Sequence, residues 1–220
     1  MANLFQIRNI QNSQTRNQNR FTLRFNNLDS ILDKAKNHRL SGVVDRYNAV
    51  KNVIYKGDFT LAQTLELSLL TCSVPNIQIE TQRIKRFNDS VAATTMFAEP
   101  EDMTVTFYDY VNGSASAIML LWQALVGDKK TGALGFKEDF ILRTAHLFMY
   151  GPDAPGYSDT ELASKYLEKH EVINIFPKGV NLGEHTYESG EARRVEVTFS
   201  IDNIYPVEYK GYDATNQVIG

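Results

Sequence analysis

The chain has 220 residues, of which 43% are hydrophobic and 22% charged, with a formal net charge of -3. This length and composition suit one all-β domain, or a compact domain with an extension, and they exclude general disorder. The charge is uneven: residues 1–60 carry ten Lys or Arg against four Asp, or +6, which leaves -9 for the remainder. An acidic body binds nucleic-acid phosphates poorly, so DNA binding is disfavoured.

The sequence lacks the motifs of the common catalytic and metal sites. Cys72 is the only cysteine, which excludes an intramolecular disulfide and a cysteine-rich zinc site. The four histidines are scattered, residues 127–132 lack the ending of a phosphate-binding loop, and no G-x-S-x-G motif occurs. We therefore predict no catalytic residue, no metal ligand and no cofactor, and a protein that is not an enzyme.

Targeting signals are also missing from the sequence. The N-terminus has no basic segment followed by an apolar run, and no stretch of about 18 apolar residues occurs. The sequence therefore predicts a protein that is made in a cytoplasm and has no membrane partner.

Residues 1–57 are predicted to form an N-terminal extension. Its first 27 residues are rich in Asn and Gln and poor in large apolar side chains, so they cannot offset their own ordering entropy without a neighbour. From Asp29 onwards the apolar spacing predicts two short helices. Residues 58–211 would then form the main β-domain, and residues 212–220 a C-terminal tail.

After Gly57, the apolar residues recur with a period of two along the sequence. Residues 59–67 and then Ile77 and Ile79 alternate as in half-buried strands. Residues 86–101 are predicted to be a long loop, because they are too irregular for a strand. The loop contains Val91, Met96 and Phe97, which makes it too apolar to be freely solvated, so a partner surface should cover it.

A strand and a helix come next in the chain. Residues 103–108 alternate strictly and favour a strand. Ser114 or Ser116 is suited to cap a helix that ends at Gly127. The helix should pack against the sheet through apolar side chains spaced i, i+3, i+4 and i+7, and their burial is worth about 6 to 12 kcal/mol before entropy is subtracted. These side chains are Ile118, Leu121, Trp122 and Leu125.

The second half of the chain is predicted to contain short strands separated by loops. We expect a loop at 127–135, a strand at 145–150, a helical insertion at 158–170, a strand at 172–176, a turn region at 177–183 and a regular strand at 193–204. The predicted fold class is therefore mainly β, a β-sandwich or barrel with one packed α-helix and a partly helical N-terminal extension.

The order of elements from residue 71 to 206 resembles the tail tube proteins of contractile-tailed bacteriophages. The segments that carry the resemblance are SVPNI at 73–77, MTVTF at 103–107, LWQ at 121–123, VINIFP at 172–177, GE at 183–184 and RVEVTFSID at 194–202. The N-terminal extension and the insertion at 158–170 depart from this family's plain tube subunit. A tube initiator near the baseplate carries such additions.

The resemblance implies a structural virion protein that forms hexameric rings. The rings would stack into the inner tail tube, through which DNA passes without specific binding, and tail sheath and baseplate proteins would be the partners. Assembly is expected in the host cytoplasm. Three alternatives remain: a tube initiator of the same fold, the tube protein of a type VI secretion-like machine, and a soluble sugar-binding or enzyme-accessory β-sandwich.

Residues 86–102 are predicted to form an extended hairpin loop that reaches the neighbouring ring. Burial of its apolar side chains could stabilise an assembly only if a partner supplied the other wall. The expected inter-ring contact residues are Arg86, Val91, Met96, Phe97 and Glu101.

Overall fold

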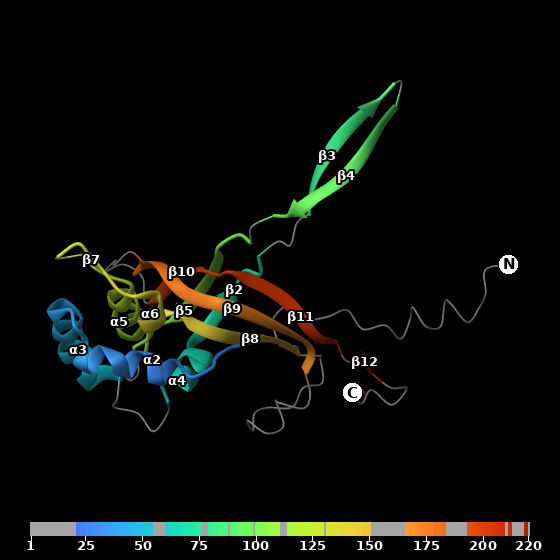
Figure 1. Cartoon of the computed structure of the whole chain (residues 1–220). Helices are drawn as coiled ribbons and strands as arrows, with labels where there is room; N and C mark the ends of the chain where they lie inside the picture. Colours follow the sequence, from blue (N-terminus) through green and yellow to red (C-terminus); the bar gives the residue numbers. More distant parts are fainter. Residues whose placement is uncertain are drawn as a thin grey trace. The chain divides into compact units, whose positions relative to one another are not determined.

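The computed structural model divides the chain into two compact units (Figure 1). The larger unit comprises Leu23–His146 and Glu171–Tyr205, and the smaller unit comprises Met1–Thr22, Leu147–His170 and Pro206–Gly220. The residues that the structure describes are 21–54, 60–75, 79–87, 89–98, 100–110, 114–129, 131–150, 166–183, 193–209, 211–212 and 218–219.

A seven-stranded sheet confirms the predicted mainly β fold. Six of its strands follow the order β1-β8-β9-β10-β5-β2, and β11 pairs with β9 beside this path. Strands β1, β8, β9 and β11 each have residues in both units. Their bounds are β1 Phe21–Phe25, β2 Leu69–Cys72, β5 Met103–Tyr108, β8 Leu142–Tyr150, β9 Tyr166–Asn181, β10 Arg194–Ser200 and β11 Asn203–Tyr209.

The centre of the sheet shows the alternation that the sequence predicts. Strand β10 pairs antiparallel with β5, with Val197 opposite Val105. The apolar side chains on one face of both strands are fully buried, whereas their neighbours in sequence are exposed or half-buried, so this face forms the core. The buried side chains are Met103, Val105, Phe107, Val195, Val197 and Phe199.

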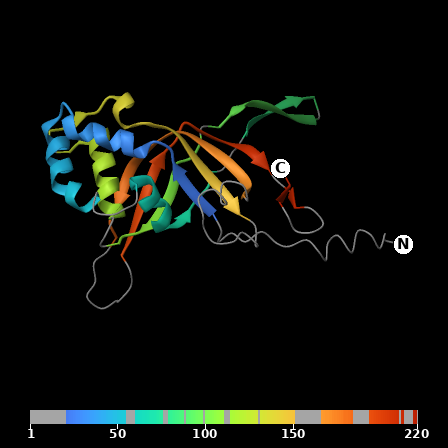
Figure 2. The ribbon, with the colours of Figure 1, turned by 90° about the horizontal axis from the view of Figure 1, so that it is seen from below.

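Helix α5 (Ala115–Val126) covers this core, as predicted. The Ser114 side chain accepts a hydrogen bond from the Ala117 N–H, and Gly127 is the C-cap. The Trp122 indole donates to the Phe140 carbonyl at 2.7 Å and meets Phe25 edge-to-face, with ring centroids 5.8 Å apart. Figure 2 shows the helices grouped beside the strands. The other helices are α2 Leu28–Asp33, η1 Lys34–Asn37, α3 Ser41–Ile54, α4 Leu61–Ser68 and α6 Lys137–Phe140.

The N-terminal region differs from the predicted extension. The two short helices are present as α2 and α3, but Leu23, Phe25, Leu28 and Leu32 are buried, and β1 is a strand of the main sheet. The boundary at residue 57 is therefore wrong, because residues from Leu23 onwards supply part of the core. The Asn- and Gln-rich residues 1–20 lie outside the described residues.

Residues 61–68 form helix α4 and not the predicted strand. Leu61 and Leu65, which also fit a period of two, are spaced i, i+4 and both are buried. Thr60 and Gln63 form a capping box, in which each side chain bonds the backbone of the other. This local cap satisfies backbone donors at the helix start and favours a helix over a strand.

The predicted loop at 86–101 is mostly a strand. Strand β3 (Ile79–Arg86) pairs antiparallel with β4 (Asp89–Phe97), and the two make a separate two-stranded ribbon, the β3–β4 hairpin (Figure 1). The pairing has a register shift beside Glu80 and Thr81. None of the described side chains of the ribbon is buried, so neither face requires the regular apolar alternation of a half-buried strand. Ile77 lies outside the described residues.

Three predictions for the second half need correction. Residues 166–170, expected in a helical insertion, begin strand β9, and residues 158–165 lie outside the described residues. Strand β9 also continues to Asn181 through Pro177, where a turn region was expected, since β10 pairs with it there. The expected strand at 193–204 is interrupted at Ile201 and Asp202, which divide it into β10 and β11, and both of these strands pair with β9.

Short two-stranded pairs complete the fold. The predicted loop at 127–135 contains β6 (Gly127–Asp128) and β7 (Ala133–Leu134), joined by a turn in which Gly132 has a φ of 72°, which favours glycine. Near the C-terminus, β12 (Gly211–Tyr212) pairs with β13 (Val218–Ile219). In the smaller unit, Phe148, Tyr150 and Tyr166 form an apolar cluster, and the Tyr166 hydroxyl donates to Glu208.

Candidate assembly surfaces and a basic pocket

The β3–β4 hairpin exposes apolar side chains. Ile84 and Val91 are directly opposite each other, and Val91 and Met96 have exposed fractions of 52% and 63%. None of the described hairpin side chains is buried. Because side chains on both faces of the ribbon meet solvent, no part of the described chain covers it.

The expected inter-ring residues fall on this hairpin and its base. Val91 and Met96 lie on β4, and Glu101 is exposed shortly after it. The backbones of Arg86 and Phe97 belong to β3 and β4, but their side chains lie outside the described residues. Beside Glu101, the Asp102 carboxylate accepts a hydrogen bond from Lys178 at 2.6 Å. A contact of these residues with another ring stays a prediction.

Edge strands of the described sheet leave backbone groups for further pairing. Within the described sheet, β1 lies at one end of the strand order and β2 at the other. Strand β2 is short and pairs with β5, and Ser73 continues the contact by donating its N–H to the Thr104 carbonyl at 2.8 Å. Open edges are sites where a strand of another chain can add.

The side chains expected to pack helix α5 against the sheet are all inside the protein. Ile118, Leu121, Trp122 and Leu125 are each 0% exposed. They contribute to the core of the larger unit and have no surface to offer a ligand.

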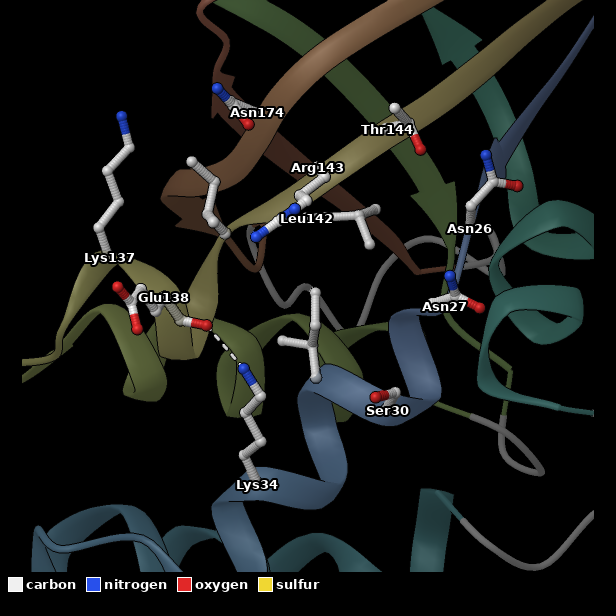
Figure 3. A pocket seen from close by; sticks show the side chains of 12 residues that line it. Asn26, Asn27, Ser30, Lys34, Lys137, Glu138, Leu142, Arg143, Thr144 and Asn174 are labelled. Carbon is white, nitrogen blue, oxygen red and sulfur yellow. Dashed lines mark hydrogen bonds between the residues drawn. The ribbon is translucent and has the colours of Figure 1, made fainter.

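A pocket of about 670 Å³ lies in the larger unit, between α2, α6 and the strands β8 and β9. Figure 3 shows α2 on one side of it and β8 on the other. Nine of its twelve lining residues are polar or charged, and they include three cations and one carboxylate. The lining residues are Asn26, Asn27, Ser30, Ile31, Lys34, Lys137, Glu138, Ile141, Leu142, Arg143, Thr144 and Asn174.

The three cations of the pocket have different degrees of restraint. The Lys34 ammonium donates a hydrogen bond to the Glu138 carbonyl at 2.6 Å, and this bond joins η1 to α6. Lys137 lies 3.4 Å from the Asp202 carboxylate, which also accepts from the Asn174 amide at 2.7 Å. Arg143 is exposed and has no polar partner among the described residues.

Two asparagines shape the backbone around the pocket. Asn27 has a φ of 61° at the start of α2, and Asn174 has a φ of 55° within β9. Asparagine tolerates this left-handed conformation better than most residues. The sequence analysis did not predict the pocket, because its lining comes from segments up to about 150 positions apart that only the fold brings together.

No group of three His, Cys, Asp or Glu side chains within the described ranges is arranged to hold a metal ion. Burial raises the pKa of the Cys72 thiol to about 12, so the sulfur is protonated at neutral pH and is a poor nucleophile. The pocket itself contains neither cysteine nor histidine. Among the described helices, none is long and apolar enough to cross a membrane.

Comparison with known proteins gives structural matches only. No family model matches the chain, and no curated protein matches it by sequence. The anti-feeding prophage cap, described as the tube terminating cap, has a TM-score of 0.52 and 11% identity, and the match covers 89% of this chain and 92% of that one.

Two further similar structures have TM-scores just below 0.5. A chain of the anti-feeding prophage baseplate has a TM-score of 0.49 and 8% identity, covering 89% of this chain and 97% of that one. A chain of the sheath/tube terminator of an extracellular contractile injection system has a TM-score of 0.48 and 11% identity, covering 64% and 85%. At these identities the likeness concerns the fold alone. The chain therefore has a tail-tube-like fold, as the resemblance in sequence predicted.

Proposed function

We propose that this chain is a structural ring subunit of a contractile tail. In this proposal, six copies form a ring, rings stack into the inner tube or close its end, and sheath and baseplate proteins are the partners. The observation that supports it most directly is the match to a tube terminating cap along nearly the full length of both chains. A structural role without catalysis is part of this proposal.

The open sheet supports the proposed ring formation. Strands β1 and β2 are the two ends of the described strand order. If β1 of one subunit pairs with β2 of the next subunit, the same contact is repeated between all neighbours and the ring can close. Obligate interfaces of this type bury roughly 2,000 to 5,000 Å². The number of copies, six, comes from the family resemblance.

Contact between rings is assigned to the β3–β4 hairpin. Its exposed Val91 and Met96 would be removed from water only when a second ring supplies an apolar surface. The described part of the same subunit does not cover the hairpin. Burial of its apolar side chains against a second ring would therefore stabilise the stacking of rings. The side chains of Arg86, Phe97 and Glu101 belong to the same proposed contact.

A genome conduit is the proposed role of the assembled tube in a phage virion. Residues 61–220 carry a net charge of -9, and like charge on a lumen wall repels DNA phosphates within a Debye length of about 8 Å at physiological salt. DNA would therefore pass without being held.

A subunit at the end of the tube is the second candidate. The cap whose fold is shared over 92% of its length is described as terminating its tube. The two candidates predict different particles, because a main tube subunit continues to add rings whereas an end subunit stops after one.

Sedimentation and negative-stain microscopy of the purified full-length chain test both candidates. Six-fold tubes that lengthen with concentration support the main tube subunit. Single six-fold rings at every concentration support the end subunit. A protein that sediments as a monomer up to about 100 µM, where interfaces of the expected size are saturated, would overturn the proposal.

A further inference from the structure

We propose that Phe87 of the β3–β4 hairpin is the anchor that seats this hairpin on a second copy of the chain. The inference rests on the proposed stacking of rings and assigns its central contact. Arg86 and Asp89 are the last pair of the hairpin, which places Phe87 in the turn between the strands. The Phe87 side chain is 108% exposed, and no other large hydrophobic side chain among the described residues is as exposed.

The backbone conformation of Phe87 is unfavourable for this residue type. Its φ of 47° lies in the left-handed region, which glycine and asparagine adopt readily and a bulky aromatic residue adopts rarely. Two-residue hairpin turns prefer pairs such as Asn-Gly for this reason. The chain therefore has an aromatic ring at a position where the turn itself favours glycine or asparagine. Strained positions of this kind cluster at binding and other functional sites, so the ring is expected to serve a contact.

The two faces of the hairpin differ in chemistry. Ile84 and Val91 are opposite each other on one face, where both are about half exposed. Arg83 and Lys85 flank Ile84 in sequence, so they lie on the other face, and both are exposed. A matching partner surface is therefore apolar where it meets the tip and the first face, and acidic near the second.

A second copy of this chain has the matching composition. The hairpin residues 79–97 carry +1, from three Lys or Arg against two acids, whereas residues 61–220 as a whole carry -9. The body of the larger unit also exposes large apolar side chains, among them Leu67, Leu134 and Phe136. Both the hairpin and these side chains are exposed in the subunit, so neither covers the other within it. The acidic body disfavours an anionic membrane or nucleic acid as the partner, because both would repel it.

Substitution of Phe87 separates a role in the turn from a role in the contact. Phe87→Asn suits the left-handed backbone but removes the ring, so the full-length chain should unfold at the same or a higher temperature. Its rings should nevertheless stack about tenfold more weakly, because a central aromatic anchor is lost. Phe87→Tyr, the control, keeps a ring and should stack as the wild type does. Circular dichroism measures unfolding, and sedimentation measures stacking.

An indole at the same position reports the contact directly. Trp122 is the only tryptophan and is 0% exposed, so a soluble quencher such as acrylamide reaches only the indole that Phe87→Trp introduces. Quenching of this indole should be strong in dilute subunits. It should fall about fivefold on assembly, because an anchor at the centre of an interface is shielded from water.

The outcomes separate this contact from the proposed function. If Phe87→Asn stacks like the wild type, or the introduced indole stays accessible in every assembly, the tip is not the anchor and the ring proposal stands. If vesicles of phosphatidylglycerol or double-stranded DNA protect the indole whereas assembly does not, the partner belongs to one of those classes and this assignment is overturned. A wild type that stays monomeric overturns both proposals.

Discussion

Helix α5 and the β3–β4 hairpin both carry apolar side chains, but their surroundings are opposite. Ile118, Leu121 and Trp122 are fully buried against the subunit's own sheet. Val91 and Met96 remain more than half exposed on a ribbon that no described part of the subunit covers. The comparison indicates that burial of α5 stabilises the subunit, whereas burial of the hairpin can stabilise only an assembly.

Removal of the N-terminal core segment should have the largest effect on stability. Deletion of residues 1–57 removes Leu23, Phe25, Leu28 and Leu32 from the core together with strand β1, so the subunit should lose its cooperative unfolding transition. Deletion of residues 1–20 removes none of these side chains and should retain the transition. Circular dichroism during heating checks both. A folded 58–220 fragment would show that the core extends less far than its burial indicates.

Truncation of the central aromatic side chain should have the next largest effect. Trp122→Ala removes the contacts with Phe25 and Phe199 and the hydrogen bond to the Phe140 carbonyl. The expected loss is about 3 to 5 kcal/mol of unfolding free energy, measured by urea denaturation. Trp122→Phe, the control, should lose less because it keeps an aromatic ring. Equal losses for both variants would mean that the indole N–H, and not the packing, carries the effect.

Loss of the helix cap should cost less. The Ser114 hydroxyl accepts from the Ala117 N–H at 3.3 Å and donates to Asp109 at 2.9 Å. Ser114→Ala should lower the free energy of unfolding by about 1 kcal/mol. Ser114→Thr, which keeps a capping oxygen, should recover most of the loss. If alanine and threonine behave alike, Ser116 and Asp109 maintain the helix start without this cap.

Changes on the hairpin should have the smallest effect on the subunit. Val91→Ser combined with Met96→Ser should change the unfolding free energy by no more than about 0.5 kcal/mol, because both side chains already meet solvent. The same variant should shorten tubes or prevent rings from stacking, as seen in negative stain. Met96→Ser with Phe97→Ser tests the other end of β4 in the same way.

A conservative change on the hairpin, Thr94→Ser, serves as the control. It should leave both stability and stacking unchanged. If the paired apolar changes unfold the subunit while ring stacking survives, the hairpin belongs to the core and the difference from α5 disappears.

The sequence alone determined the elements whose signals are local. Strand β5 and the start of β10 follow from strict alternation, and α5 follows from its i, i+3, i+4 and i+7 spacing, the Ser114 cap and Gly127. The mainly β fold followed from these elements. Such signals depend on neighbours within a few residues, so no knowledge of the partner elements is needed.

Only the tertiary structure decided the elements whose state depends on distant partners. Residues 61–68 fit a strand as well as a helix by their apolar spacing, and burial of Leu61 and Leu65 on one helical face resolved the ambiguity. Strand β9 runs through Pro177 because β10 pairs with it, and β4 exists because β3 lies beside it. The pocket required the same long-range information: Lys34, Lys137 and Arg143 become neighbours only when η1, α6 and β8 fold against one another.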